Sequence, residues 1–301
     1  MPPEIALALL AYGSLAWGDA LVKALGAGSG PTLSVFEITF YTTLVAGFFL
    51  LPAKDDGERW RDFWRLKRPY AVHLRSFLSA GATLLGVAAF TTIPLAEAYA
   101  LIFLAPLFVT LLSALVLREE VGIWRWSAVI LGFGGVLLVV RPGFKALETG
   151  HFAALGVALL AAITVIQLRA LANDEKRVSL LGMHVVYGLA VNGLFIAASG
   201  ALTVPDMRQW IFILLTGACI GVGQFCLLSA IRLSAANQIA PTHYSQIGWA
   251  VIIGALFFGE VPDVLTIAGL AVLAAAGLLT VMREIVRLGR ARFNPLGRNR
   301  L

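Results

Sequence analysis

Long unbroken blocks of apolar residues, separated by short polar connections, occupy most of this chain of 301 residues. A helix needs about twenty residues to cross roughly 30 Å of hydrocarbon, and most of the blocks approach that length. Backbone groups in lipid must be satisfied within a helix or a closed barrel, and barrel strands would alternate in polarity. The pattern therefore predicts an all-α integral membrane protein of ten transmembrane helices. The expected spans are 4–26, 32–51, 70–90, 95–117, 124–140, 152–171, 180–201, 210–231, 235–258 and 264–282.

The composition excludes a soluble domain. Apolar residues make up 59% of the chain and charged residues 13%, whereas a soluble domain is nearer half apolar and a quarter charged. The net charge of +6 comes from Lys and Arg in a few short loops and the tail, a pattern typical of membrane orientation rather than of nucleic-acid binding. Cys219 and Cys226 share one apolar block and form neither a disulfide framework nor a zinc spacing, so we expect no metal site.

Lys and Arg also predict how the chain is oriented. They concentrate in the connections on one side of the ten spans, which places both termini in the cytoplasm. The longest of these connections, 54–69, interleaves charges with Trp60, Phe63 and Trp64. Its composition fits either a short amphipathic helix in the headgroup zone or a solvated basic loop.

An internal duplication is the most informative feature. Each half contains an Ala-Pro step followed by a Glu-Val step: Pro106 and Glu120 in the first half, Pro241 and Glu260 in the second. We therefore divide the chain into a five-helix repeat at 4–141, a second at 151–283 and a basic cytoplasmic tail at 284–301. Five is an odd number, so the second repeat must be inverted relative to the first. Inverted repeats around a central cavity are typical of secondary transporters, with the solute held near the midplane.

These blocks resemble the drug/metabolite transporter superfamily, specifically its ten-helix bacterial members with two EamA-type repeats. The resemblance is carried by the Ala-Pro and Glu-Val blocks, by Leu-Val-Val-Arg-Pro-Gly at 138–143 and by Ala-Pro-Thr-His-Tyr-Ser-Gln at 240–246. It implies export or exchange of small metabolites across a bacterial inner membrane without ATP. The inverted duplication and the polar ninth span predict that the transport proceeds by alternating access. The amino-acid exporters of that superfamily are the nearest parallel, so the resemblance implies an amino acid as the solute.

The ninth expected span is the most polar. His243, Tyr244 and Gln246 follow Asn237 and Gln238 in its first half, and such a run is costly in lipid unless it lines water or bonds to neighbouring helices. We predict that His243, Tyr244 and Gln246 bind the solute, with interhelical hydrogen bonding as the structural alternative. His243 is more simply explained as a hydrogen-bonding group than as a coupling site.

Facing helices should complete the substrate site. Tyr99 and Phe103 occupy the stretch of the fourth span that corresponds to the polar part of the ninth, and their rings suit an apolar or cationic solute. Trp17 in the first span and Gln224 in the eighth are further binding candidates. Ordinary packing is the alternative for the rings, and helix–helix hydrogen bonding is the alternative for Gln224.

Three ionisable residues lie inside the first two spans, where charge is expensive and usually functional. Asp19, Lys23 and Glu37 are therefore coupling or gate candidates. The alternative is a structural ion pair of Lys23 with either carboxylate. The repeat glutamates, Glu120 and Glu260, lie at the membrane edge, where we expect them to cap a helix or to pair with a nearby arginine.

Rival functions find little support in the sequence. A multi-pass membrane enzyme needs catalytic groups, yet Asp19 is the sole aspartate well inside an expected span and no hydrolase, metalloprotease or phosphate-binding motif is present. A receptor or scaffold would not need the polar ninth span. We therefore expect a monomeric transporter, not an enzyme, whose partners are a small solute and the lipid bilayer, with no cofactor.

Overall fold

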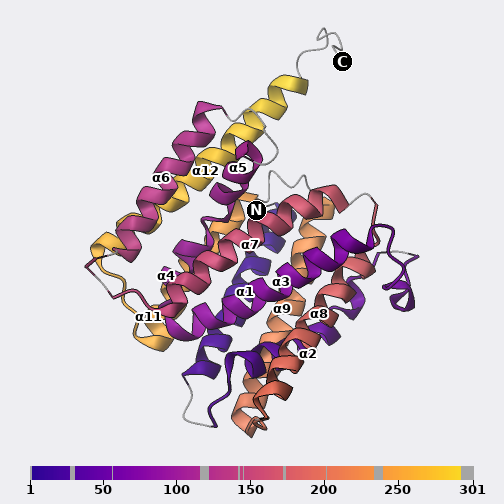
Figure 1. The fold of residues 1–301 in the computed structure, drawn as a ribbon. Coiled ribbons are helices and arrows are strands. Elements are labelled where there is room, and N and C mark those ends of the chain that lie inside the picture. The colour runs from indigo at the N-terminus through magenta and orange to yellow at the C-terminus, as the bar shows by residue number, and fades with distance from the viewer. Residues whose placement is uncertain are drawn as a thin grey trace.

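The computed structural model describes residues 2–27, 31–55, 57–115, 122–141, 143–144, 146–171, 174–200, 202–233 and 240–292. Every regular element in these ranges is helical (Figure 1). The long helices are α1 (Pro3–Gly26), α2 (Val35–Phe49), α3 (Pro69–Thr92), α4 (Leu95–Ile102), α5 (Ala105–Leu115), α6 (Ile123–Val140), α7 (Thr149–Leu171), α8 (Arg177–Ser199), α9 (Met207–Leu233), α11 (Ser245–Phe258) and α12 (Val264–Arg292). Three short 3₁₀ turns accompany them: η1 (Leu51–Ala53), η2 (Trp60–Asp62) and η3 (Ala240–Tyr244).

The helices confirm an all-α membrane protein. Six described segments are long and apolar enough to cross a bilayer, and three shorter apolar helices accompany them. Large side chains such as Phe48, Leu194 and Leu256 remain exposed on helix surfaces, whereas α1 buries small ones such as Ala8 and Ala11. Exposed apolar belts around a small-residue interior are what a hydrocarbon solvent selects, because lipid covers the outer face and small residues let the helices approach.

Two expected spans are interrupted. The span predicted at 95–117 is divided into α4 and α5 by a turn at Phe103 and Leu104, and the described part of the span predicted at 235–258 consists of η3 followed by α11. The described residues of these two spans are therefore not uniform α-helices, because Pro106 and Pro241 lack the N–H that a helix interior requires. Residues 235–239, with Asn237 and Gln238, and Glu120 lie outside the described residues.

Two other boundaries differ from expectation. The described part of the connection 54–69 contains the single turn η2 rather than an amphipathic helix, and the rings of Phe63 and Trp64 stack on each other. Phe63 also lies against Gly182 of α8. The last helix continues to Arg292, past the expected start of the tail at 284, and it projects beyond its neighbours beside α6 (Figure 1).

The packing partners are exchanged between the two halves. Helix α1 lies along α9, and α7 lies along α3; α2 contacts both α9 and α8, and α8 also contacts α3. Helix α6 pairs with α12, where the backbones of Gly135 and Gly269 meet so closely that a β-carbon on either would clash. In chain order, α7, α8, α9 and α12 are the counterparts of α1, α2, α3 and α6. Exchanging counterparts turns the α1–α9 contact into α7–α3 and the α2–α9 contact into α8–α3, and it leaves the α2–α8 and α6–α12 contacts unchanged.

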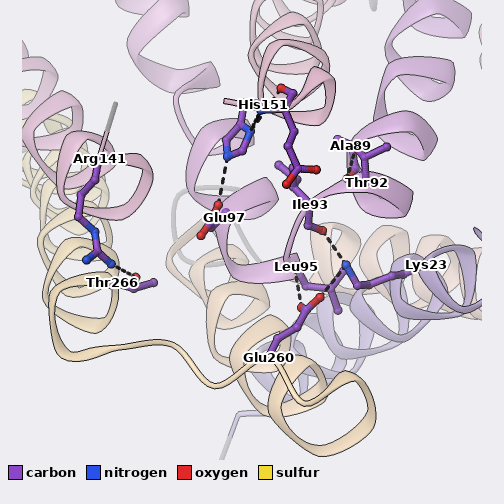
Figure 2. A network of polar contacts seen from close by, with 11 residues as sticks. Lys23, Ala89, Thr92, Ile93, Leu95, Glu97, Arg141, His151, Glu260 and Thr266 are labelled. Atoms are coloured by element: carbon purple, nitrogen blue, oxygen red, sulfur yellow. Dashed lines mark hydrogen bonds and ion pairs between the residues drawn. The ribbon is translucent and has the colours of Figure 1, made fainter. Parts of the chain in front are cut away.

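The bundle has two ends, the Glu260 end and the Arg75 end. The Glu260 end holds the last turn of α1 and of α6, the first turns of α4 and α7, and the connection from α11 to α12 (Figure 2). The Arg75 end holds the α2–α3 and α7–α8 connections, which are joined by Arg68 with Asp174 and by Arg177 with Asp55.

Candidate functional site

The two interrupted helices face each other, and their interruptions hold aromatic rings. Phe103, in the turn between α4 and α5, lies 4.7 Å from the His243 ring and 5.1 Å from the Tyr244 ring of η3. Tyr12 of α1 stacks on the other side of His243, at 4.7 Å and 27°. Tyr99, one helical turn before Phe103, extends the group with a ring separation of 6.2 Å. We call Tyr12, Tyr99, Phe103, His243 and Tyr244 the ring group.

A carboxylate borders the ring group. The Tyr99 hydroxyl donates a short hydrogen bond to Oδ2 of Asp19, a partly buried residue of α1. Phe90 of α3 covers Tyr99 on another side, with ring centroids 5.6 Å apart. A carboxylate inside a bundle is costly unless its oxygens are hydrogen-bonded, so the Tyr99 hydroxyl is the group that accommodates Asp19 here. Together they offer a solute an acceptor beside apolar ring faces.

Tyr244 is held against the backbone of α12. A β-carbon at Gly277 would lie 1.8 Å from the Tyr244 hydroxyl oxygen, so the ring uses space that only glycine leaves. His243 is joined to Gln246 of α11 by a side-chain hydrogen bond. Both η3 residues of the ring group are therefore positioned from the second half of the chain, while Phe103 and Tyr99 come from the first.

The Glu260 end is fastened by a largely buried ion pair (Figure 2). Nζ of Lys23 lies 2.7 Å from Oε1 of Glu260 and donates to the carbonyl oxygen of Ile93 at 2.6 Å. The other carboxylate oxygen of Glu260 accepts the backbone N–H of Leu95 at 3.0 Å and so caps the start of α4. Pairing of Lys23 with Asp19 or Glu37 was the wrong prediction. The capping role expected of the repeat glutamate is confirmed for Glu260, although it caps a helix of the other half.

A cavity of about 270 Å³ opens beside this ion pair. Its wall includes Glu97 of α4, Glu260, and Asp263 and Thr266 around the start of α12. Behind Glu97, its carboxylate lies 3.1 Å from Nε2 of His151, and both side chains are buried. Nδ1 of His151 accepts the N–H of Glu148 at 3.0 Å, which assigns the imidazole proton to Nε2 and makes it a donor to Glu97. The contact ties α4 to α7 across the two halves (Figure 2).

The mouth of the same end carries an exposed pair. Nη2 of Arg141 donates to Oδ1 of Asp263 at 2.6 Å and to the Thr266 hydroxyl at 3.1 Å. The Arg141 hydrogen bond is the main cause that holds the pKa of Asp263 well below its usual range. This pair joins the end of α6 to the start of α12.

The structure brings together five of the binding candidates and one coupling candidate. Tyr99, Phe103, His243, Tyr244 and Gln246 are linked in one continuous group, with Asp19 at its edge.

The other candidates lie elsewhere. Trp17 packs edge-on against the exposed ring of Phe257, 5.2 Å away. Glu37 forms a capping box with Ser34 at the start of α2 and accepts the N–H of Thr203. Gln224 is half-buried on α9, beside Gly223, whose backbone lies against Leu15 of α1. Lys23 lies at the Glu260 end, where it forms part of the closing contact.

Three residues of the site went unnoticed in the sequence. Tyr12 sits in an apolar block, and nothing local distinguishes it from a packing residue. Glu97 belongs to the repeated block, and His151 lies near a helix start. Their pairing spans 54 residues and depends on how α4 and α7 meet. Within the described residues, no group of three or more His, Cys, Asp and Glu side chains could hold a metal ion.

Several proteins named as solute carriers or transporters are similar to this chain in sequence. Solute carrier family 35 member G1 of Mus musculus is 28% identical over 66% of this chain, and the match spans 58% of the mouse protein. A riboflavin transporter of Rhizobium johnstonii is 27% identical over 74% of each chain, and an S-adenosylmethionine uptake transporter of Rickettsia bellii is 24% identical over 92% of each. The chain therefore spans about three fifths of the length of the mouse relative and nearly all of the Rickettsia relative.

A solved crystal structure shares the fold. It is 16% identical to this chain, covers 92% of it and 97% of its own chain, and superposes with a TM-score of 0.62. The model of the EamA-like transporter family matches residues 4–141 and 148–283, which together include almost all the described helices. This protein is thus a multi-pass membrane protein that belongs to the EamA-like transporter family.

Proposed function

We propose that this protein is a secondary transporter that carries a small organic solute by alternating access between two inverted five-helix repeats, 4–141 and 151–283. The exchanged packing partners support the two-fold relation, because α1–α9 and α7–α3 are equivalent contacts in the two halves. The interrupted helices support the position of the solute. Broken helices near the midplane are where transporters of this kind hold their cargo.

One observation carries the proposal most directly. The ring group lies where both interrupted helices meet, and the Lys23–Glu260 contact closes the bundle on one side of it. An occluding contact at one end beside a polar and aromatic centre is the arrangement that alternating access requires. Opening the Glu260 end would break the Lys23–Glu260 ion pair and free the cap of α4.

The chemistry of the centre favours a solute with a flat or cationic part. Aromatic faces attract cations and stack on heteroaromatic rings, and Asp19 can receive an ammonium or N–H donor once the Tyr99 hydroxyl is displaced. Amino acids, and larger metabolites that combine an amino group with a ring, meet this description. Riboflavin and S-adenosylmethionine, named for two relatives, also carry heteroaromatic rings.

We further propose that the Arg75 end faces the cytoplasm of a bacterial cell, with the protein a monomer in the inner membrane. The basic α2–α3 connection supports this orientation, because Lys and Arg accumulate on the cytoplasmic side. The Glu260 end then faces outward, and the described conformation is closed on that side.

Reconstitution tests the proposal. Purified protein in liposomes would be screened with labelled riboflavin, S-adenosylmethionine and a panel of amino acids, with and without a pH gradient. We expect uptake of at least one solute above protein-free liposomes, and at least tenfold slower uptake for Phe103→Ala, which removes the central ring. The matched control is Phe152→Ala, an exposed ring on α7. Failure of the whole panel, or equal loss in both variants, would contradict the proposal.

A further inference from the structure

Three polar side chains at the Arg75 end have buried atoms without partners. Nε and Nη1 of Arg75, Nδ1 of His184 and Oε1 of Gln167 are all shielded from solvent, and none has a hydrogen-bond partner. They come from α3, α8 and α7 respectively. Buried polar atoms in native proteins are nearly always hydrogen-bonded, so three in one region point to a ligand that completes them.

Arg75 and His184 lie on α3 and α8 close to the point where these helices touch, since Nδ1 of His73 is 3.0 Å from the Tyr187 hydroxyl, and the Arg75 charge acts on the His184 imidazole. The antiparallel register of α3 and α7 brings Gln167 to the same level. Gly81 lies against Leu160, and Thr92 lies against Gly150. Continued toward the start of α3, this register places Arg75 opposite Gln167 to within about one residue. Gln167 and Arg75 therefore lie at about the same level of the bundle, where α3 packs against both α7 and α8.

The nearby carboxylates are already engaged with other groups. Glu175 accepts the backbone N–H of Arg68, and Glu58 accepts those of Arg177 and Val178 at the start of α8. Asp62 lies near Arg65 and Lys176.

Asp55 and Asp174 pair with Arg177 and Arg68. Within the part of the chain that the structure describes, Arg75 forms no ion pair. A guanidinium so placed is costly without a counter-ion.

We propose that Arg75, His184 and Gln167 form a binding site for a phosphate group that bears or adjoins a hydroxyl. Guanidinium N–H groups form a fork that matches two phosphate oxygens, and the His184 imidazole can donate a third hydrogen bond from Nδ1. Oε1 of Gln167 is an acceptor and would take the hydroxyl hydrogen.

The depth suits such a ligand. Arg75 lies about 9 Å along α3 from Pro69, within reach of the headgroup level for a side chain of its length. The basic α2–α3 connection adds a positive field that would attract an anion to this end. A lipid headgroup and free phosphate share this chemistry, and the experiment separates them.

The test is thermal unfolding of the purified full-length protein in a neutral detergent, followed by tryptophan fluorescence. The additions are phosphatidylglycerol, phosphatidylcholine, and sodium phosphate against sodium chloride at equal ionic strength. We expect phosphatidylglycerol or sodium phosphate to raise the Tm by about 5 °C. Arg75→Gln should lose that gain, yet without additions its Tm should be no lower than that of the wild type, because an unpaired buried charge has been removed. Arg61→Gln, which removes an exposed arginine from the same end, should keep the gain.

Each outcome decides the matter. A gain with phosphatidylglycerol alone supports a lipid headgroup, and a gain with sodium phosphate supports a free anion. Equal gains with phosphatidylcholine, a gain that survives in Arg75→Gln, or no gain at all would overturn the site. A lower Tm of Arg75→Gln without additions would instead show that Arg75 acts as a structural residue.

Discussion

The two ends of this protein accommodate a buried basic side chain in different ways. At the Glu260 end, Lys23 is 8% exposed, and its ammonium contacts a carboxylate and a backbone carbonyl. At the Arg75 end, two guanidinium nitrogens are shielded from solvent and contact no acceptor. A paired charge fixes the helices that supply its partners, whereas an unpaired one favours whatever ligand can complete it.

The contacts that hold the helices together also differ between the two ends. Closure of the Glu260 end rests on contacts between α1, α4 and the α11–α12 connection, so it can be undone only by separating those elements. The Arg75 end combines pairs at its surface, such as Arg68 with Asp174, whose side chains are half-exposed, with backbone hydrogen bonds to Glu175 and Glu58. Exposed pairs contribute little free energy, so the surface pairs stabilise this end only weakly.

The largest effect should come from removing the cation of the Glu260 end, which leaves that end with an unpaired charge, as at the Arg75 end. Lys23→Met leaves the Glu260 carboxylate buried without its cation, which should lower the free energy of unfolding by about 3 kcal/mol. The measurement is SDS-induced unfolding of the purified protein. Lys54→Met removes an exposed lysine and should change the free energy by less than about 0.5 kcal/mol. Adding Glu260→Gln to Lys23→Met should recover part of the loss, and wild-type stability of Lys23→Met alone would refute the buried pair.

Next in size is the contact that links the ring group to α12, between the two ends. Gly277→Ala places a β-carbon inside the Tyr244 ring position, so we expect a loss of about 2 kcal/mol from overpacking. Gly248→Ala on α11 is the matched control, because a β-carbon there meets open space. Equal stability of the two variants would mean that Tyr244 is free to move away from α12, and that the centre is less rigid than the Glu260 end.

The sequence predicted the helical segments more fully than the contacts between them. Apolar length alone placed a helix in each of the ten expected spans, because lipid leaves the backbone few other conformations. The same reasoning joined α4 to α5, since Pro106 lies near a helix start, where proline is tolerated as well as where it breaks a helix.

Most of the site contacts that the sequence did not predict join residues far apart along the chain. Lys23 meets Glu260 across nearly the whole chain, and no local pattern distinguishes that partner from Asp19 only four residues away. Glu37 did carry a local signal, because Ser34 three residues before it forms a capping box at the start of α2. The ring group was predictable in part, since the duplication places Phe103 and His243 in corresponding stretches.

A smaller effect should follow from replacing the neutral partner of a carboxylate. Tyr99→Phe removes the hydroxyl that donates to Asp19, and we expect a loss of about 1.5 kcal/mol in SDS-induced unfolding. Tyr70→Phe, at an exposed ring, is the control. Asp19→Asn in the Tyr99→Phe background should recover stability by removing the unsatisfied charge. If Tyr99→Phe matched the wild type, the hydrogen bond would contribute nothing, and Asp19 would have to be accommodated by another group.

The smallest effect is expected at the exposed Arg141–Asp263 pair of the Glu260 end. This pair tests whether pairing without burial is enough to stabilise that end. Arg141→Gln should lower the Tm by only about 1 °C near neutral pH, because solvent screens the contact with Asp263. Since the folded protein holds the pKa of Asp263 below its usual range, the contribution is present above that range and is lost as the pH falls. The Tm values of wild type and Arg141→Gln should therefore converge in acid. A Tm loss as large as that of Lys23→Met, or a difference that grows in acid, would show that pairing rather than burial decides how firmly this end is closed.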